Sequence, residues 1–558
     1  MLNYSVAELR INMKLNKISA LLLGAMVVAS CSDIDDQNPE SGKITGGQVQ
    51  ETTDALSSRL DATLNGMYTM AGSPLTVFGI DNDRADDFGF ISAALSQDLE
   101  GADMFSGNNT YNWFSAACQY STRNPDYANP YARYTLPYRQ IGVAEQVINS
   151  INVETADAKG KAQAGQAYAT RAYDYMALAP YFQFGYATSK DQPCVPIIGK
   201  NDANNNPRAT VAEVYDVIVA DLTKAIELLD GYSRTDKTQI DQHVAYGLRA
   251  RAYLAMGEYA KAAEDADKAM QGYTPASIAD VSVPAFDNIN ESNWIWGFGM
   301  TNAMVNGDGS QGYANPSSWF GSFSGDGYAP ATGNVPCINV LLYDKIPSTD
   351  VRKGWWLNAD KHSPNWANLT WAGATGDAIA DLTTDDGGKV PFNAYTSIKF
   401  GQKSGVGSTL NNNDFPLMRV EEMILIKVEG LAKSGHEAEA KTLLESFVKT
   451  YRDPSYSVTA GGRTLADEIW FQRRVELWGE GFFVSDAKRL GKPIVRFHAG
   501  QTSNYPAAFK FNLAANDGWL NMRFPTREKN NNAGIIDNQE GSQPTPNQNG
   551  ELRDGVTD

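Results

Sequence analysis

Two short stretches of this chain, far apart in the sequence, share one spacing of glycine and alanine. They are Gly257-Glu-Tyr-Ala-Lys-Ala262 and Gly435-His-Glu-Ala-Glu-Ala440, and each follows an apolar segment with helical periodicity. In the first stretch, small and apolar side chains before and after the glycine continue one helical stripe. Because alanine is small, two antiparallel helices joined at the glycine can approach closely. The pattern therefore predicts helical hairpins and a mostly α-helical fold.

Two further matches indicate that the hairpin recurs. Arg171-Ala172-Tyr173 and Arg251-Ala252-Tyr253 each fall late in the first helix of a pair. Recurrent helix–turn–helix units of this kind are typical of tetratricopeptide repeats. The sequence predicts a scaffold of three or four degenerate tetratricopeptide-like hairpins, with an unrelated helical bundle as the alternative. The helical segments expected in the first half of the chain are residues 52–71, 131–151, 158–184, 210–229 and 241–270.

Composition divides the remainder of the chain. Helical periodicity covers about residues 52–271 and 416–490, whereas residues 272–415 are rich in Gly, Asn, Pro and Trp and lack a sustained helical period. Long irregular segments of this kind lie at the surface and often carry binding residues. Residues 541–558 are polar and are expected to form a frayed tail. Residues 51–540 are therefore expected to form a single domain with a loop-rich insertion.

The first thirty residues have the pattern of a signal peptide. Two lysines precede an apolar run at residues 18–29, which is too short for a bilayer because spanning needs ~20 residues. Small residues then lead directly to Cys31, so we expect acylation of its thiol, with palmitate for example, and anchoring by lipid. An ordinary secretory peptide is the alternative. Met13 is the expected start, and residues 31–50 are the expected flexible tether.

Charge and catalytic motifs exclude several classes of function. The net charge of −18 disfavours binding to nucleic acid, which is itself anionic. If Cys31 is acylated, Cys118, Cys194 and Cys337 allow at most one disulfide, whose pairing the sequence leaves open. The zinc-protease helix and the Gly-x-Ser-x-Gly elbow do not occur, because Ala440 and Phe323 stand at the positions that would complete them. The chain is therefore expected not to be an enzyme.

A group of acidic residues near the N-terminus raises the question of a metal. Asp81, Asp83, Asp86 and Asp87 offer the oxygen ligands that calcium prefers. Their spacing is not that of an EF-hand, and a solvated acidic loop is the simpler interpretation. No cofactor is expected, with structural calcium as the alternative.

Several longer motifs together carry a family resemblance. They are Arg419-Val-Glu-Glu-Met-Ile-Leu-Ile-Lys-Val-Glu429, Asp467-Glu-Ile-Trp-Phe-Gln-Arg-Arg-Val-Glu-Leu-Trp-Gly-Glu-Gly481, Asp486-Ala-Lys-Arg489, and the segments that begin at Thr210 and Phe524. With the acidic Ser32-Asp-Ile-Asp-Asp36 after the lipidation site, the chain resembles the SusD/RagB family of surface nutrient-binding lipoproteins over nearly its whole mature length. One departure is Gln472, where the family usually has glutamate.

The resemblance implies a fold, a location and a function. It implies a lipoprotein anchored in the outer membrane and facing the cell exterior. There it would bind extracellular glycan and deliver it to a SusC-like TonB-dependent transporter. Capture of peptide or protein by the same fold is the alternative. A glycan hydrolase is a more remote alternative, since the many acidic residues of the chain could include two catalytic carboxylates.

Aromatic residues in loops are the candidate binding residues, because sugar rings stack on aromatic faces beside polar groups. Seven of the eleven tryptophans lie between residues 294 and 371. Trp294 and Trp296 alternate as in a buried strand, and Trp470 and Trp478 lie in the helical motif, so these four are expected in the core. The expected ligand-binding residues are Tyr111, Asn112, Trp113, Tyr313, Asn315, Trp319, Phe320 and Tyr328.

The charged motif is expected to be structural. Arg473 shares a helical stripe with Ile469 and Leu477, which places its guanidinium at least half inside the protein. A buried guanidinium requires a carboxylate partner. The expected partners are Glu421, Glu422, Glu429 and Glu476. Thr464 is expected to cap the start of this helix, and Gly491 to end the next one.

Overall fold

The computed structural model describes residues 57–72, 89–106, 113–301, 317–325, 335–383 and 391–558. The chain divides into two units, Met1–Asp61 and Ala62–Asp558. Helix α3 (Ser57–Met70) spans this division, and every other described element belongs to the second unit. In the described ranges, no helix is long and apolar enough to cross a bilayer.

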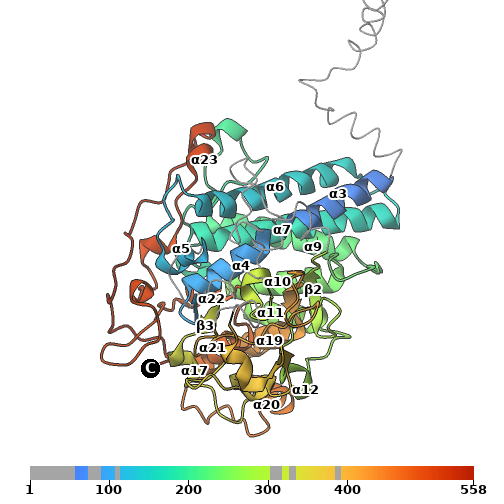
Figure 1. The fold of residues 1–558 in the computed structure, drawn as a ribbon. Helices are drawn as coiled ribbons and strands as arrows, with labels where there is room; N and C mark the ends of the chain where they lie inside the picture. Colours follow the sequence, from blue (N-terminus) through green and yellow to red (C-terminus); the bar gives the residue numbers. More distant parts are fainter. Residues whose placement is uncertain (1–56, 73–88, 107–112, 302–316, 326–334, 384–390) are drawn as a thin grey trace, which may run out of the picture. The chain divides into compact units, whose positions relative to one another are not determined.

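The second unit is built on a stack of antiparallel helices. Each packs on the next in the order α6, α7, α9, α10, α11, α19, α20, as Figure 1 shows. The expected helical hairpins are therefore confirmed, including those on either side of Gly257 and Gly435. The helices are α6 (Ala128–Ser150), α7 (Ala158–Phe182), α9 (Val211–Leu228), α10 (Gln242–Met256), α11 (Tyr259–Ala269), α19 (Val420–Lys433) and α20 (Glu437–Tyr451).

Glycine shapes these hairpins in two ways. Gly257, between α10 and α11, has a φ of 80°, and Gly435, between α19 and α20, has a φ of 92°, both in the left-handed region that favours glycine. Gly430 acts differently, because it lies where α19 crosses α11. A Cβ atom there would lie 2.6 Å from the carbonyl oxygen of Tyr259 and 2.9 Å from Cβ of Ala263. Glycine at this position thus permits the close contact between α19 and α11.

The second helical block continues with α21 (Leu465–Glu476) and α22 (Phe483–Leu490). The Thr464 hydroxyl accepts a hydrogen bond of 3.2 Å from the backbone N–H of Asp467, which confirms the expected N-cap. Gly491 follows α22 with a φ of 64°, which confirms the expected helix end. Both ends were predictable because capping depends on local sequence.

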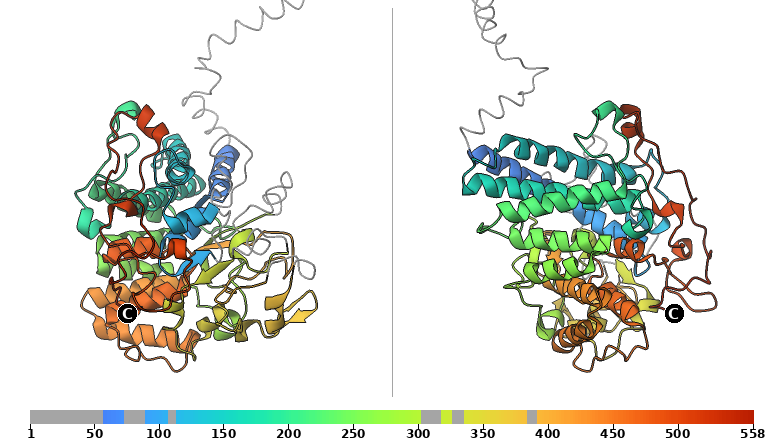
Figure 2. Two further views of the ribbon diagram at one scale, coloured as in Figure 1. Left: turned by 60° about the vertical axis from the view of Figure 1, so that its left-hand side comes forward. Right: turned by 180° about the vertical axis from the view of Figure 1, so that it is seen from behind.

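The insertion between the blocks contributes short strands and its own core. β2 (Trp294–Phe298) pairs with β6 (Phe415–Arg419), and all five residues of β2 are buried, which confirms the strand expected at Trp294 and Trp296. β1 (Met104–Ser106) pairs with β3 (Pro336–Ile338), and β4 (Thr370–Trp371) with β5 (Ala374–Thr375). Figure 2 shows the insertion, drawn in yellow, on one side of the helical stack.

Two early helices were not expected from the sequence. They are α4 (Gly89–Glu100) and α5 (Trp113–Gln119). Their C-terminal carbonyl groups bind one distant side chain, the fully buried Arg496. Its Nε donates to Gly101 O at 2.9 Å, Nη1 to Cys118 O at 2.6 Å and Nη2 to Leu99 O at 2.9 Å. The short helices are α8 (Tyr186–Ser189), η3 (Ala203–Asn205), α12 (Ile278–Val281), α15 (Ser317–Phe320), α17 (Val340–Tyr343), η4 (Val351–Trp355), η5 (Pro364–Trp366), η6 (Gly376–Asp381), η7 (Ala507–Phe509), η8 (Gly518–Leu520) and α23 (Thr526–Asn531).

The C-terminal segment corrects the expectation of a frayed tail at residues 541–558. Asp554 is buried and lies 2.6 Å from Nη1 of Arg474, whose Nη2 binds Asp103 at the same distance. Val556 is buried beside it. The polar composition was misleading because a buried arginine needs carboxylate partners, and this segment supplies one.

Candidate functional site

Most of the expected binding residues lie outside the described residues. This applies to Tyr111, Asn112, Tyr313, Asn315 and Tyr328, to the lipidation site Cys31, and to the acidic group Asp81, Asp83, Asp86 and Asp87. Trp113 is the first residue of α5. Trp319 and Phe320 are the last two residues of α15.

Trp319 and Phe320 correct the expectation that their rings face a ligand. The two side chains are 0% and 1% exposed. The Trp319 ring lies 4.4 Å from that of Phe114, and the Phe320 ring 5.1 Å from that of Phe400. Both rings therefore fill the core of the insertion, where no sugar can stack on them.

The tryptophan-rich stretch as a whole has the same explanation. Every tryptophan side chain that the structure describes is buried, and this includes all seven between residues 294 and 371. As expected, Trp470 and Trp478 are also core residues. Irregular segments lack the stripes of aliphatic side chains that helices bury, so large aromatic rings supply most of the apolar volume in the core of the insertion. The cluster thus marks a core, not a binding surface.

The framework nevertheless brings together the described residues that flank the three segments with the remaining candidates. Ser106, directly before residues 107–112, pairs with Pro336, which closely follows residues 326–334. Phe114, just after residues 107–112, packs on Trp319 of α15, which follows residues 302–316. Ser317, the first residue of α15, donates a hydrogen bond to the carbonyl oxygen of Asn411. The flanking residues of all three segments are therefore neighbours.

Arg473 is buried, as expected, but none of the four expected glutamates is its partner. Its Nε lies 2.7 Å from Oδ2 of Asp486 on α22. Each expected glutamate instead binds another arginine: Glu476 binds Arg352, Arg419 and Arg452; Glu421 binds Arg419 and Arg452; Glu422 binds Arg251; and Glu429 binds Arg489. Helical periodicity predicted the burial, whereas pairing depends on how helices far apart in the sequence meet.

The electrostatics of this network fit a structural role. Burial by itself would raise the pKa of Glu476, but Arg452, Arg419 and Arg352 together hold that pKa well below its ordinary value. Gln472, the departure from the family pattern, accepts a 2.7 Å hydrogen bond from Nη2 of Arg352. The carboxylate thus stays ionised and fully engaged, which suits a permanent ion pair and not proton transfer.

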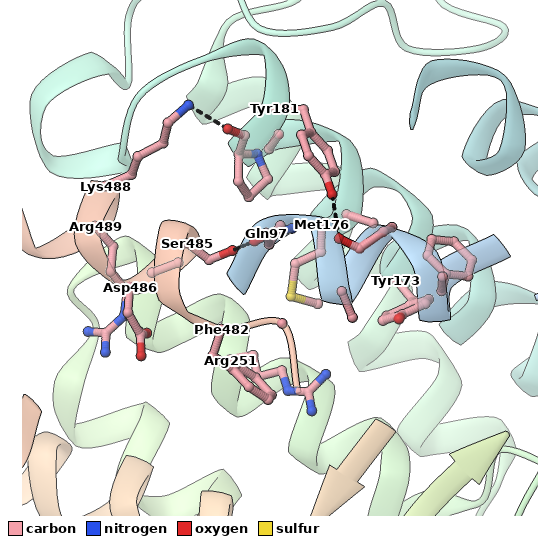
Figure 3. A pocket seen from close by; sticks show the side chains of 18 of the residues that line it. Gln97, Tyr173, Met176, Tyr181, Arg251, Phe482, Ser485, Asp486, Lys488 and Arg489 are labelled. Carbon is pink, nitrogen blue, oxygen red and sulfur yellow. Dashed lines mark hydrogen bonds and ion pairs between the residues drawn. The ribbon is translucent and has the colours of Figure 1, made fainter. Parts of the chain in front are cut away.

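A cavity that sequence analysis did not predict lies between the first helical block and α22 (Figure 3). Its volume is about 180 Å³, and its walls come from α4, α6, α7, α10, α19 and the segment around α22. No local motif could reveal a space that so many separate segments enclose.

Metal and disulfide chemistry find no support in the described residues. No group of three or more His, Cys, Asp or Glu side chains is arranged there to hold a metal ion. Cys118, Cys194 and Cys337 are buried free thiols, so no disulfide joins them. Burial raises the pKa of the Cys118 thiol to about 11 and the pKa values of the other two to about 12.

The stacked hairpins, with an irregular insertion on one side, define a tetratricopeptide-like helical scaffold. A family described as "starch-binding associating with outer membrane" matches residues 81–254, and the SusD family matches residues 349–552. These matches together cover more than half of the chain, and the chain belongs to the SusD/RagB family. A comparison with curated proteins gave no match.

Solved structures share the fold at low sequence identity. A SusD-like carbohydrate binding protein from Bacteroides vulgatus is 22% identical, with a TM-score of 0.66 over 86% of this chain and 97% of that one. A SusD superfamily protein from Bacteroides thetaiotaomicron is 20% identical, with a TM-score of 0.64 over 87% and 99%. Surface glycan-binding protein A from Bacteroides thetaiotaomicron, in complex with laminarihexaose, is 16% identical, with a TM-score of 0.61 over 86% and 99%. The description of the first family match and the names of two of these neighbours describe binding proteins.

Proposed function

We propose that this protein binds extracellular glycan at the outer membrane and is not an enzyme. The observation that carries the proposal is membership of the SusD/RagB family. The family that matches residues 81–254 is described as starch-binding and associated with the outer membrane. A structural neighbour with a bound glucan hexasaccharide, laminarihexaose, supports the ligand class. Delivery to a SusC-like TonB-dependent transporter, with Cys31 acylated in the outer membrane, completes the proposal.

We place the glycan site on residues 107–112, 302–316 and 326–334. The proximity of the described residues that flank these segments supports this assignment, because residues far apart in the sequence can then contact one sugar chain. Trp113, Tyr111, Tyr313 and Tyr328 would supply ring faces, and Asn112 and Asn315 would bind hydroxyl groups. Binding to such a site should be weak for each sugar and increase with chain length.

The test is an affinity measurement with a panel of oligosaccharides. We expect Trp113→Ala and Tyr313→Ala each to weaken binding about tenfold, which corresponds to ~1.4 kcal/mol for one lost stacking contact. Tyr127→Ala is the matched control, since this ring is 46% exposed but lies directly before α6 and outside these three segments of the sequence. Trp319→Ala should lower the melting temperature, because that ring is in the core.

The outcomes separate the alternatives. If no glycan binds and the protein retains peptides from a mixture, peptide capture replaces glycan binding. Release of reducing sugar from a bound glycan would establish a hydrolase. Cys31→Ser should release the protein from membranes, and co-purification of the untreated lipoprotein with a TonB-dependent barrel would test the partner.

A further inference from the structure

The cavity beside α22 has the size of a small-ligand site. At about 180 Å³ it is slightly larger than an engineered protein cavity of ~150 Å³ that binds benzene. It therefore has room for one six-membered ring. Phe90, Leu136, Met176 and Phe482 are among its apolar walls. Met176 and Phe482 are only partly buried, so the space reaches the surface.

One wall carries an arginine that is only partly paired. Nε and Nη2 of Arg251 each lie 2.7 Å from the carboxylate of Glu422, and Nη2 also donates to Leu417 O. Its Nη1 has no hydrogen-bond partner among the described residues. The guanidinium lies 5.1 Å from the ring centre of Phe482, and Figure 3 shows both groups beside the same hollow.

A second unpaired nitrogen lies near the same ring. Arg473 lines the cavity, is 3% exposed, and has its guanidinium 5.9 Å from the centre of Phe482. Its Nε and Nη2 bind Asp486, but Nη1 has no partner within the described ranges. Two guanidinium groups close to Phe482 thus each keep one nitrogen, Nη1, without a hydrogen-bond partner among the described residues.

Tyr173 adds a polar group to the wall of the cavity beside Phe90. Its ring packs edge-on against Phe90 at 4.8 Å, and its hydroxyl has no hydrogen-bond partner among the residues described. Burial raises the pKa of Tyr173, so the hydroxyl keeps its proton and can act as a donor at physiological pH. All three free groups are donors, and the Glu422 and Asp486 carboxylates are already occupied by arginines.

We propose that this cavity binds a small aromatic carboxylate. Its ring would lie against Phe90, Met176 and Phe482, and its carboxylate would accept hydrogen bonds from the free donors of the cavity. A sugar fits less well, because hydroxyl groups against these apolar walls would lose hydrogen bonds to water at ~1–3 kcal/mol each. The site is therefore independent of the glycan site, from which it differs in both residues and ligand class.

The experiment compares benzoate with benzyl alcohol, its neutral analogue, by calorimetry on the full-length protein. We expect benzoate to bind at least tenfold more tightly. Tyr173→Phe should weaken benzoate severalfold and benzyl alcohol less, because a carboxylate is the stronger hydrogen-bond acceptor. Replacing the ion pair by Arg251→Met with Glu422→Leu removes one guanidinium without stranding the buried glutamate, and should strongly reduce the preference for benzoate.

A variant that fills the cavity provides a second test of the proposed site. Ala177 lines it and is partly buried, so Ala177→Leu should reduce benzoate affinity at least tenfold. Ala438→Leu, at an exposed position of α20, is the matched control and should change nothing. The proposal is overturned if benzoate binds no better than benzyl alcohol, or if a stably folded Ala177→Leu protein binds it as the wild type does.

Discussion

Glu476 is fully buried and binds three arginines. Its carboxylate oxygens lie 2.8 Å from Nε of Arg452, 3.1 Å from Nη1 of Arg419 and 3.3 Å from Nη1 of Arg352. These arginines come from three separate segments: the end of α20, the end of β6 and η4. A single side chain therefore holds the insertion and the helical stack together.

Loss of this charge should be costly. We expect Glu476→Gln to lower the free energy of unfolding by ~3–5 kcal/mol, because it removes a counter-charge that three buried arginines share. Urea unfolding provides the measurement. Glu437→Gln is the control, since Glu437 pairs with Lys441 at the surface. Equal effects of the two variants would contradict a structural role for the buried network.

The same carboxylate predicts a pH dependence. Because the folded-state pKa of Glu476 is depressed, its contribution is fully present above the ordinary value of 4.5 and is lost as the pH falls below it. Burial raises the pKa of Asp98 to about 7, so the contribution of Asp98 to stability increases as the pH falls and opposes that of Glu476. The readout is therefore the difference in melting temperature between wild type and Glu476→Gln, which should narrow from pH 6 to pH 3. If this difference in melting temperature stayed constant, the ionisation of Glu476 would not contribute to the pH dependence of stability.

At the scale of helices, glycine has opposite effects at two positions. Gly430 lies where α19 meets α11, so an added methyl group would collide with backbone atoms of Tyr259 and Ala263. Gly142 lies within α6, and an added Cβ atom would have no heavy atom within 4 Å. Substitution by alanine therefore tests close helix packing at Gly430 and helix propensity at Gly142.

We expect Gly430→Ala to destabilise the protein and Gly142→Ala to stabilise it by ~0.5–1 kcal/mol, the usual helix preference for alanine. Thermal unfolding of both variants gives the comparison. If Gly430→Ala were as stable as wild type, the close approach of α19 and α11 would be wrong.

The helices differ in how far the sequence could predict them. Those with an apolar stripe and clear caps, such as α9 with its Thr210–Glu213 capping box, were predictable from residues alone. Helix α4 was not, because all its residues but Ala94 are buried and it has no polar face to create a periodic signal. The candidate site was harder still, since sequence cannot distinguish a core ring such as Trp319 from a ring displayed in a loop.

At the scale of the whole molecule, the C-terminal segment completes the fold. Asp554 neutralises Arg474, and the Nε2 atom of His498 lies 3.1 Å from the carbonyl oxygen of Thr557. The Asn547 N–H also donates to Lys510 O at 2.6 Å. Residues 541–558 thus bind groups from several parts of the chain.

Deletion of residues 541–558 should therefore lower the melting temperature markedly. The single variant Asp554→Asn should reproduce part of the loss, because Arg474 would keep only Asp103. Glu551→Gln, three residues away and exposed, is the matched control. A truncated protein that melts with the wild type would restore the interpretation of this segment as a frayed tail.

The contacts of Arg496 have a consequence for biosynthesis. The carbonyl groups at the ends of α4 and α5 bind a guanidinium that follows Gly101 by 395 residues and Cys118 by 378. At ~5–20 residues per second, a ribosome adds that length in roughly 20–80 s. During this interval the two early helices lack their final partner, so the N-terminal part of the nascent chain stays incompletely folded until synthesis is nearly finished.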